Sequence, residues 1–299
     1  MKILVVGSKG FIGSHCVDFF SKEHEVWGCD VVIDYNTFNY LFIESIDSDF
    51  QDIFLRQKYD VCINCSGAAS VPFSLERPFH DFQLNALNVY KILESIRRFN
   101  SECKYINLSS AAVYGNPEKI PIQESFRLAP VSPYGVHKYL AEQICKEFTD
   151  FWRLQTCCIR IFSAYGPRLK KQLLWDIYKK AQKDGDLELF GTGDESRDFI
   201  YVTDVVSIIN RAILYSDFNC DILNAANGEQ ITISHISKLM IEAMGISKKV
   251  VFNQITRKGD PLNWEADIQK IVSIGYSPKV DIAAGIKKYV LWLRESGLL

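Results

Sequence analysis

The stretch VVGSKGFIGSH, residues 5–15, places three glycines at the spacing G-x-x-G-x-x-G directly after an apolar run. Glycine allows a sharp turn and a close approach of a ligand to the backbone, and the last glycine of such a turn allows close helix–strand packing. Free N–H groups at the start of a helix favour a phosphate or pyrophosphate. Gly7, Gly10 and Gly13 therefore predict a pyrophosphate site, with a plain strand–helix turn as the alternative.

Asp30 ends a second strand-like segment, residues 25–29, roughly 20 residues after the turn, where an acidic group can hydrogen-bond the hydroxyls of an adenosine ribose. A carboxylate there repels a 2′-phosphate, so the pattern favours NAD over NADP. We expect Phe11 and Ile12 to contact the same cofactor. The alternative is an aspartate that only serves a turn at the strand end.

Strand-like and helix-like segments alternate through the first half of the chain. The strands are expected at 2–6, 25–29, 59–65, 104–108 and 156–162, and the helices at 11–21, 49–57, 79–99 and 133–152. This alternation predicts an α/β fold with a doubly wound parallel sheet of the Rossmann type and right-handed crossovers.

The pattern changes after Gly166. Helix-like segments are expected at 205–214, 233–244 and 282–294, and short strands at 187–190 and 221–224. We predict a dinucleotide-binding domain over 1–166 with a return segment at 200–225, and a smaller, interleaved substrate-binding region over 167–299. A run of basic residues between 168 and 183 is expected to be a solvated helix face.

The composition argues against several classes of protein. The chain has 299 residues, 47% of them hydrophobic, and a formal net charge of -2, which allows a large core and argues against a nucleic-acid partner. No apolar run is long enough for a membrane span and the N-terminus does not look like a signal peptide, so a cytoplasmic protein with no membrane partner is expected. The nine cysteines are expected to be reduced. Cys62 and Cys65 point to opposite faces of a strand, so neither a redox pair nor a metal site is expected.

Tyr134 and Lys138 lie at i and i+4 on a helix that begins at Pro133. A phenol normally titrates near 10, which is too high for a base at neutral pH. A nearby lysine ammonium, together with the cationic nicotinamide of NAD, would lower the pKa of Tyr134. Ser110, at the end of the strand before, can hydrogen-bond the same substrate oxygen. An exposed amphipathic pair is the alternative.

The glycine turn, CSGAAS at 65–70, NLSSAAVYG at 107–115 and YGVHK at 134–138 resemble the extended short-chain dehydrogenase/reductase family. Its NAD-dependent epimerases and dehydratases act on nucleotide sugars, and the resemblance covers nearly the whole chain. It implies Tyr134 as general base or acid, Lys138 as its electrostatic partner and cofactor-ribose ligand, and Ser110 as the catalytic hydroxyl. The further cofactor-binding residues that it implies are Ser66, Gly67, Ala68, Asn85 and Ser109.

Ala111 and Ala112 bear on the reaction. Dehydratases of this family resemble S-T-D-E-V-Y-G at this place, where the two acidic residues serve the loss of water. With two alanines neither role is filled, so dehydration is disfavoured and hydride chemistry at a carbinol carbon remains.

The resemblance also implies substrate-binding residues. They are Ser70, Ser110, Ser163, Arg197, Arg257 and Asp260. Arginine suits a diphosphate because its planar fork donates two hydrogen bonds, although an ordinary surface ion pair is the alternative. Ser163 departs from the family's asparagine in R-x-F-N-x-x-G-P-R: it keeps a hydroxyl and loses the amide donors.

These features predict an NAD-dependent epimerase that inverts C4 of a UDP-hexose through a 4-keto intermediate. An NAD(P)H-dependent reductase of a dTDP- or GDP-4-keto-6-deoxyhexose is the alternative, and a non-catalytic dinucleotide sensor is a third reading. The resemblance also implies a homodimer formed by the helices at 79–99 and 133–152, whose apolar residues could equally belong to the core.

Overall fold

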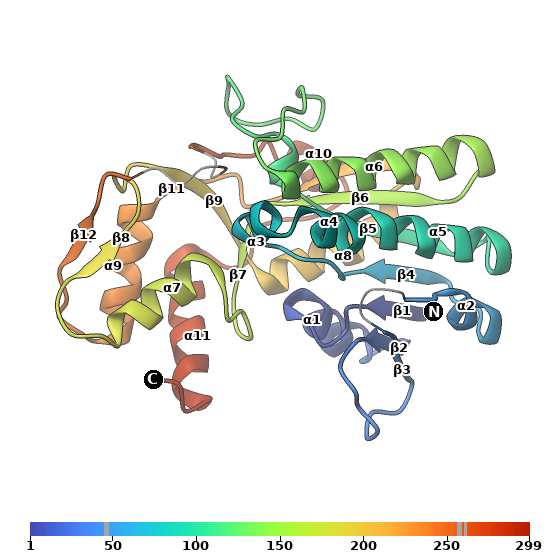
Figure 1. Ribbon diagram of the computed structural model, residues 1–299, viewed down its shortest axis with the longest axis horizontal. Coiled ribbons are helices and arrows are strands. Elements are labelled where there is room, and N and C mark those ends of the chain that lie inside the picture. Colours follow the sequence, from blue (N-terminus) through green and yellow to red (C-terminus); the bar gives the residue numbers. More distant parts are fainter. Residues whose placement is uncertain (45–47, 256–258, 260–261) are drawn as a thin grey trace.

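A large parallel sheet forms the centre of the structure, a computed structural model that describes residues 1–44, 48–255, 259 and 262–299. Seven strands stand in the order β10-β6-β5-β4-β1-β2-β3, and every neighbouring pair is parallel (Figure 1). Their bounds are β1 Lys2–Val6, β2 Glu25–Asp30, β3 Tyr40–Phe42, β4 Val61–Asn64, β5 Lys104–Ser110, β6 Thr156–Ile161 and β10 Asn219–Ala225. The predicted α/β fold with a doubly wound parallel sheet is confirmed.

The central strands are buried on both faces, which explains their uninterrupted apolar sequences. All four residues of β4 and all six of β6 are buried, and β1 has only its first residue partly exposed. Strand order reverses at β1, which has β2 on one side and β4 on the other. In such sheets ligands bind at the carboxyl ends of the strands at this reversal.

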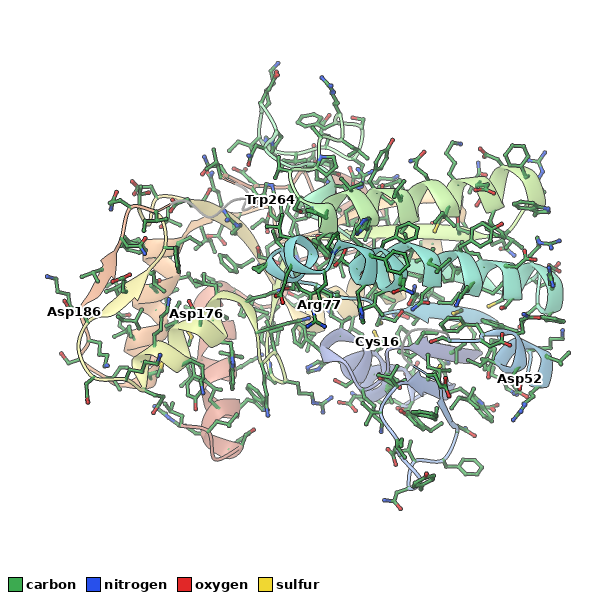
Figure 2. The ribbon with its side chains drawn as sticks, in the orientation of Figure 1. Cys16, Asp52, Arg77, Asp176, Asp186 and Trp264 are labelled. Atoms are coloured by element: carbon green, nitrogen blue, oxygen red, sulfur yellow. The ribbon has the colours of Figure 1, made fainter. Side chains whose placement is uncertain are left out.

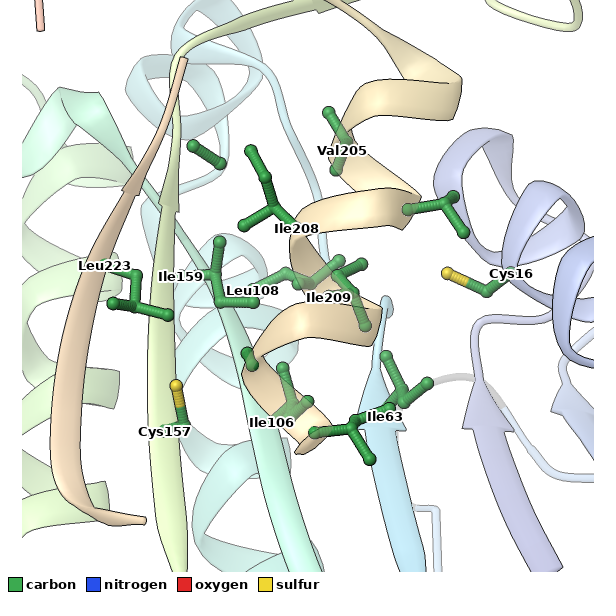
Figure 3. Close-up of a cluster of buried hydrophobic side chains, with 14 of the residues drawn as sticks. Cys16, Ile63, Ile106, Leu108, Cys157, Ile159, Val205, Ile208, Ile209 and Leu223 are labelled. Carbon is green, nitrogen blue, oxygen red and sulfur yellow. The ribbon is translucent and has the colours of Figure 1, made fainter. Parts of the chain in front are cut away.

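Helices cover both faces of the sheet. One face carries α1 (Phe11–Phe20), α8 (Val202–Tyr215) and α10 (Gln269–Ser273), and the other carries α2 (Gln51–Arg56), α5 (Asn88–Phe99) and α6 (Pro133–Trp152). Figure 3 shows Ile208 and Ile209 of α8 packed against Ile106 and Ile159 of the sheet. The segment 200–225, expected to return to the first domain, forms α8 and the sheet strand β10.

The long helix expected at 79–99 is present and contains a π-helical turn. It runs without a break through α4 (Pro78–Phe82), the π-helical turn (Gln83–Leu87) and α5, and a short helix α3 (Val71–Glu76) precedes it. A π turn inserts an extra residue into a helix and is frequent at functional sites. Here it contains the buried Asn85.

The second part of the chain forms a smaller lobe with its own core (Figure 1). Its elements are β7 Ser163–Tyr165, α7 Gln172–Ala181, β8 Leu187–Leu189, β9 Ser196–Tyr201, β11 Gln230–Thr232, α9 Ile233–Met244, β12 Val250–Phe252 and α11 Ile282–Glu295. They form a sheet β11-β9-β7 and a pair β12-β8. Figure 2 shows Asp176 and Asp186 in this lobe, and Cys16 and Asp52 in the larger one.

Within the described ranges, no helix has the length and apolar character needed to cross a membrane.

Candidate active site

The glycine turn lies at the reversal of the strand order. A Cβ at Gly13 would lie 2.0 Å from the Gly7 carbonyl oxygen, and one at Gly7, where φ is +79°, would lie 2.8 Å from the Cys65 backbone. A Cβ at Gly10 would lie 3.1 Å from the Gly7 carbonyl oxygen, which is a tight contact. Gly7 and Gly13 thus permit close packing of strand, helix and the β4 loop, and Gly10 permits the tight turn before the helix.

The first turn of α1 is suited to an anion. Gly10 is its N-cap, no side chain caps the helix, and the first turn contains no acidic residue. Phe11 and Ile12 open the helix, and Ile12 packs partly into both cores. The N–H groups of this turn have no side-chain acceptor, so the turn fits a cofactor pyrophosphate.

Asp30 lies at the end of β2, as predicted, and is 9% exposed. Its carboxylate accepts hydrogen bonds from the backbone N–H of Lys9 and of Val31, both at 2.7 Å, so it also ties β2 to the glycine turn. The Lys9 ammonium pairs with Asp34 at 2.5 Å. A carboxylate retains lone pairs for ribose hydroxyls after these two bonds, so Asp30 fits the ribose of a dinucleotide.

The sequence analysis did not find the hollow beyond Asp30. It has a volume of about 290 Å³ and is lined by Ile33, Asp34, Tyr35, Tyr40 and Phe42. Its apolar and aromatic walls, close in the chain to the predicted ribose ligand Asp30, have the character of a site for a flat base.

The loop after β4 is fixed from two sides. The Ser66 backbone N–H and hydroxyl both donate to Asn64 Oδ1, at 3.1 and 2.5 Å. Asn85 Nδ2 donates to the Ala68 carbonyl at 3.0 Å, and a Cβ at Gly67 would lie 2.5 Å from Asn85 Oδ1. Asn85 is 1% exposed and its Oδ1 has no hydrogen-bond partner among the described residues. The predicted cofactor residues Ser66, Gly67, Ala68 and Asn85 are therefore brought together, and one buried acceptor remains for a further group.

The structure brings the three predicted catalytic residues together at the end of β5 and the start of α6. The Ser110 hydroxyl lies close enough to the Tyr134 phenol to lower its pKa, and Lys138 Nζ donates to the Leu108 carbonyl at 2.9 Å. Gly135 allows this approach, since a Cβ there would lie 2.6 Å from the Ala112 carbonyl oxygen. Tyr134 is 8% and Lys138 7% exposed.

Burial dominates the titration of both catalytic candidates in the polypeptide alone. Burial raises the pKa of Tyr134 to about 12, and the nearby Ser110 hydroxyl opposes this only partly. Burial lowers the pKa of Lys138 to about 8, against the raising influence of the Asp81 charge. The expected lowering of the Tyr134 pKa by Lys138 concerns the site with NAD bound and stays a prediction; in the structure the ammonium is directed to the Leu108 carbonyl.

Ser109, a predicted cofactor residue, uses its hydroxyl within the protein. Its hydroxyl donates to Glu142 Oε1 at 2.6 Å, so the side chain is used within the core. Glu142 also accepts from Arg160, at 2.9 and 2.7 Å, and Arg160 donates to the Tyr114 hydroxyl at 2.8 Å. The sequence analysis missed this buried network because its members come from separate elements.

The sequence profile of the NAD dependent epimerase/dehydratase family matches residues 3–226. The chain belongs to this family. An uncharacterized protein of Methanocaldococcus jannaschii is 31% identical over 317 residues, covering 98% of this chain and 96% of that protein. Family membership agrees with the glycine turn and with the Ser110, Tyr134 and Lys138 arrangement, and NAD is the cofactor of this family.

Two solved structures extend the likeness. The UDP-glucose 4-epimerase of Thermotoga maritima, solved with UDP-glucose, is 28% identical with a TM-score of 0.89, covering 99% of both chains. The UDP-glucuronic acid 4-epimerase of Bacillus cereus, solved with UDP-glucuronic acid and NAD, is 26% identical with a TM-score of 0.89, covering 99% of this chain and 100% of that one.

In this family member the described substrate candidates other than Ser110 lie on three separate elements. Ser70 caps α3 by accepting from the Phe73 N–H at 3.3 Å, and Ser163 begins β7. Arg197 donates to the Leu262 carbonyl at 3.2 Å, and its guanidinium lies 5.8 Å from the ring centre of Trp264, which Figure 2 labels. Arg257 and Asp260 lie outside the described residues.

Proposed function

We propose that this protein is an NAD-dependent nucleotide-sugar epimerase that inverts C4 of a UDP-hexose. The observation that carries the proposal is the assembly of Ser110, Tyr134 and Lys138 at the carboxyl edge of the parallel sheet, where the glycine turn also lies, with Ala111 and Ala112 where a dehydratase needs acids. The buried Ala111 leaves no side chain for acid catalysis at that position. The likeness to 4-epimerases supports this reaction rather than net reduction.

The roles of the protein groups follow from their geometry. NAD, when bound, supplies reversible hydride transfer at the sugar carbon. Tyr134 removes the proton of the sugar 4-hydroxyl and returns it after the 4-keto sugar has turned. Ser110, which lies near the Tyr134 phenol, donates to the same sugar oxygen. Lys138 holds a positive charge that favours the phenolate and binds the cofactor ribose.

We propose the same binding roles as the sequence analysis did. Gly7, Gly10, Phe11, Ile12, Gly13 and Asp30 hold the cofactor, and Ser66, Gly67, Ala68 and Asn85 line its nicotinamide side. Ser109 can reach the cofactor only through its backbone. The nucleotide diphosphate is assigned to Arg197 and Arg257, and the sugar to Ser70, Ser110, Ser163 and Asp260. The division is 1–166 with 200–225 for the cofactor, and the remainder of 167–299 for the substrate.

We also propose a homodimer in the cytoplasm. Apolar side chains lie exposed on α5 and α6, among them Tyr90, Val136, Leu140 and Phe151, and a second copy would cover them. All nine cysteines are free, which suits a reducing compartment. Sedimentation of the purified protein tests the dimer, and a single species of monomer mass contradicts it.

The function is tested by mixing the NAD-loaded protein with UDP-glucose, UDP-galactose, UDP-glucuronic acid and the N-acetylated UDP-hexosamines, and following the anomeric protons by NMR. The C4 epimer of one sugar, formed without net NADH, is expected. No change with any of them contradicts the proposal.

A further inference from the structure

A buried carboxylate that the proposed mechanism does not use lies beside the catalytic helix. Asp81, in α4, has 0% exposure. Its Oδ2 accepts a hydrogen bond from His137 Nδ1 at 2.6 Å, and its Oδ1 accepts one from Asn85 Nδ2 at 3.0 Å. A buried carboxylate is costly unless it is paired, so this arrangement requires an explanation.

The partners of Asp81 connect it to both halves of the site. His137 lies between Tyr134 and Lys138 on the first two turns of α6, and its ring packs edge-on against Phe82, with centroids 5.6 Å apart. Asn85 also donates to the Ala68 carbonyl of the β4 loop. One carboxylate therefore joins the catalytic helix, the π turn and the loop predicted to line the cofactor.

The charge of Asp81 also acts on the catalytic pair. Around Lys138 the influential groups are Asp81 of α4, Lys171 before α7, Cys65 of the β4 loop and Cys158 of β6. Asp81 is the carboxylate among them and raises the pKa of Lys138, while the Lys171 charge lowers it. Asp81 raises the pKa of Tyr134 as well.

We propose that Asp81 and His137 form a positioning pair: they hold the start of α6, and Asp81 supplies the negative charge that balances the buried Lys138 ammonium. The proposal rests on the function proposed above for Tyr134 and Lys138. Neither residue touches the substrate in this scheme. They act by keeping Lys138 charged and Tyr134 in register with Ser110.

The first test is Asp81→Asn in the NAD-loaded enzyme, with the Lys138 side chain observed by NMR of ¹³Cε-labelled lysine and assigned by Lys138→Met. Removing the carboxylate charge is expected to move the Lys138 titration midpoint to lower pH by about 1 unit. The kcat for the nucleotide sugar is expected to fall by up to about 10²-fold with little change in KM, because a positioning error costs turnover.

Thr149→Val is the matched control. Thr149 is a buried residue of the same helix whose hydroxyl bonds that of Thr156 at 2.7 Å, far along α6 from the pair. It is expected to leave the Lys138 midpoint and kcat unchanged. If Asp81→Asn has the same Lys138 titration midpoint and the same kcat as Thr149→Val, the proposal is wrong.

Variants of His137 keep the test decisive if Asp81→Asn does not fold. His137→Leu removes the donor, so the carboxylate is no longer held towards α6, and both the midpoint and kcat are expected to fall. His137→Asn, which places an amide nitrogen near the position of Nδ1, is expected to restore both. If His137→Leu and His137→Asn have the same Lys138 titration midpoint and the same kcat, the proposal is wrong. If the wild-type protein epimerises no sugar, the proposed function fails, and the Lys138 midpoint still decides the role of the pair.

Discussion

Two buried polar clusters lie about one turn apart on α6, and they differ in how completely they are satisfied. Around Glu142, both carboxylate oxygens have partners from Arg160 and Ser109, and Arg160 also bonds Tyr114. Around Lys138, the ammonium has the Leu108 carbonyl as its hydrogen-bond partner, and Asn85, which bonds Asp81, has an Oδ1 with no partner among the described residues. The first cluster resembles a structural ion pair, and the second holds groups that are costly to bury without a ligand.

This difference separates stability from function. A fully paired buried network fixes the relative positions of β5, β6 and α6, and breaking it is expensive. A cluster with shifted pKa values and an unpaired acceptor stabilises the fold less but is available for chemistry. Substitutions in the two clusters should therefore affect different measurements.

The largest effect is expected for Tyr134→Phe. Loss of the proton-transferring hydroxyl should lower turnover by roughly 10²–10⁴-fold, because a positioned acid–base group contributes that much. NAD binding and the melting temperature should change little. Tyr139→Phe, on the same helix, is the control and should keep its activity. A fully active Tyr134→Phe enzyme would refute the catalytic assignment.

The next largest effect is expected for Arg160→Met, which breaks the Glu142 cluster. Arg160→Met leaves the Glu142 carboxylate buried with only Ser109 as side-chain partner, and should lower the free energy of unfolding by roughly 3–5 kcal/mol. Urea unfolding of the NAD-free protein measures this. A loss below about 1 kcal/mol would show that the two clusters do not differ as described.

Lys138→Met should have the opposite effect on stability. Burial lowers the pKa of Lys138 to about 8 from 10.5, so the charged form costs on the order of 3 kcal/mol at neutral pH. The variant also loses the hydrogen bond from Lys138 to the Leu108 carbonyl, which costs about 1 kcal/mol and offsets part of the stabilisation gained by removing the buried charge. At pH 7 the variant should be more stable by roughly 1–2 kcal/mol and inactive. A variant less stable than the wild type contradicts this.

The smallest effect is expected for the pH dependence of the stability difference between Lys138→Met and the wild type. Between the folded pKa of about 8 and the unfolded value of 10.5, the unfolded state binds more protons at Lys138. Its contribution to the free energy of unfolding therefore rises with pH across this window. The stability gap between Lys138→Met and wild type should narrow by about 1 kcal/mol or more from pH 7 to pH 10. Urea unfolding of both proteins at each pH measures this difference in stability. A difference that does not change with pH would contradict the lowered pKa of Lys138.

Parts of the fold could not be predicted from the sequence. The strands β3, β7, β11 and β12 are each three residues long, too short for a period to be recognised. The helix expected at 79–99 contains a π turn, because Asn85 bonds both Asp81 and the Ala68 carbonyl. The pattern of apolar and polar residues shows neither these short strands nor the contacts of Asn85.

The sequence by itself determined the features that rest on local spacing. They are the glycine turn at residues 7–13, the strand-end Asp30, the alternation that makes a parallel sheet, and Tyr134 and Lys138 on one helix face. Each depends on residues close along the chain, where helix and strand geometry fix relative positions.

Only the tertiary structure decided which buried charges meet. Asp81 and His137 are 56 residues apart in the chain, and Glu142 and Arg160 are 18 apart on different elements. Such partners are chosen by the packing of helices and strands against one another, and burial then sets the pKa of Tyr134 and Lys138. Local periodicity carries no information on these non-local contacts, which is why candidate catalytic residues could be selected from the sequence and their electrostatic environment could not.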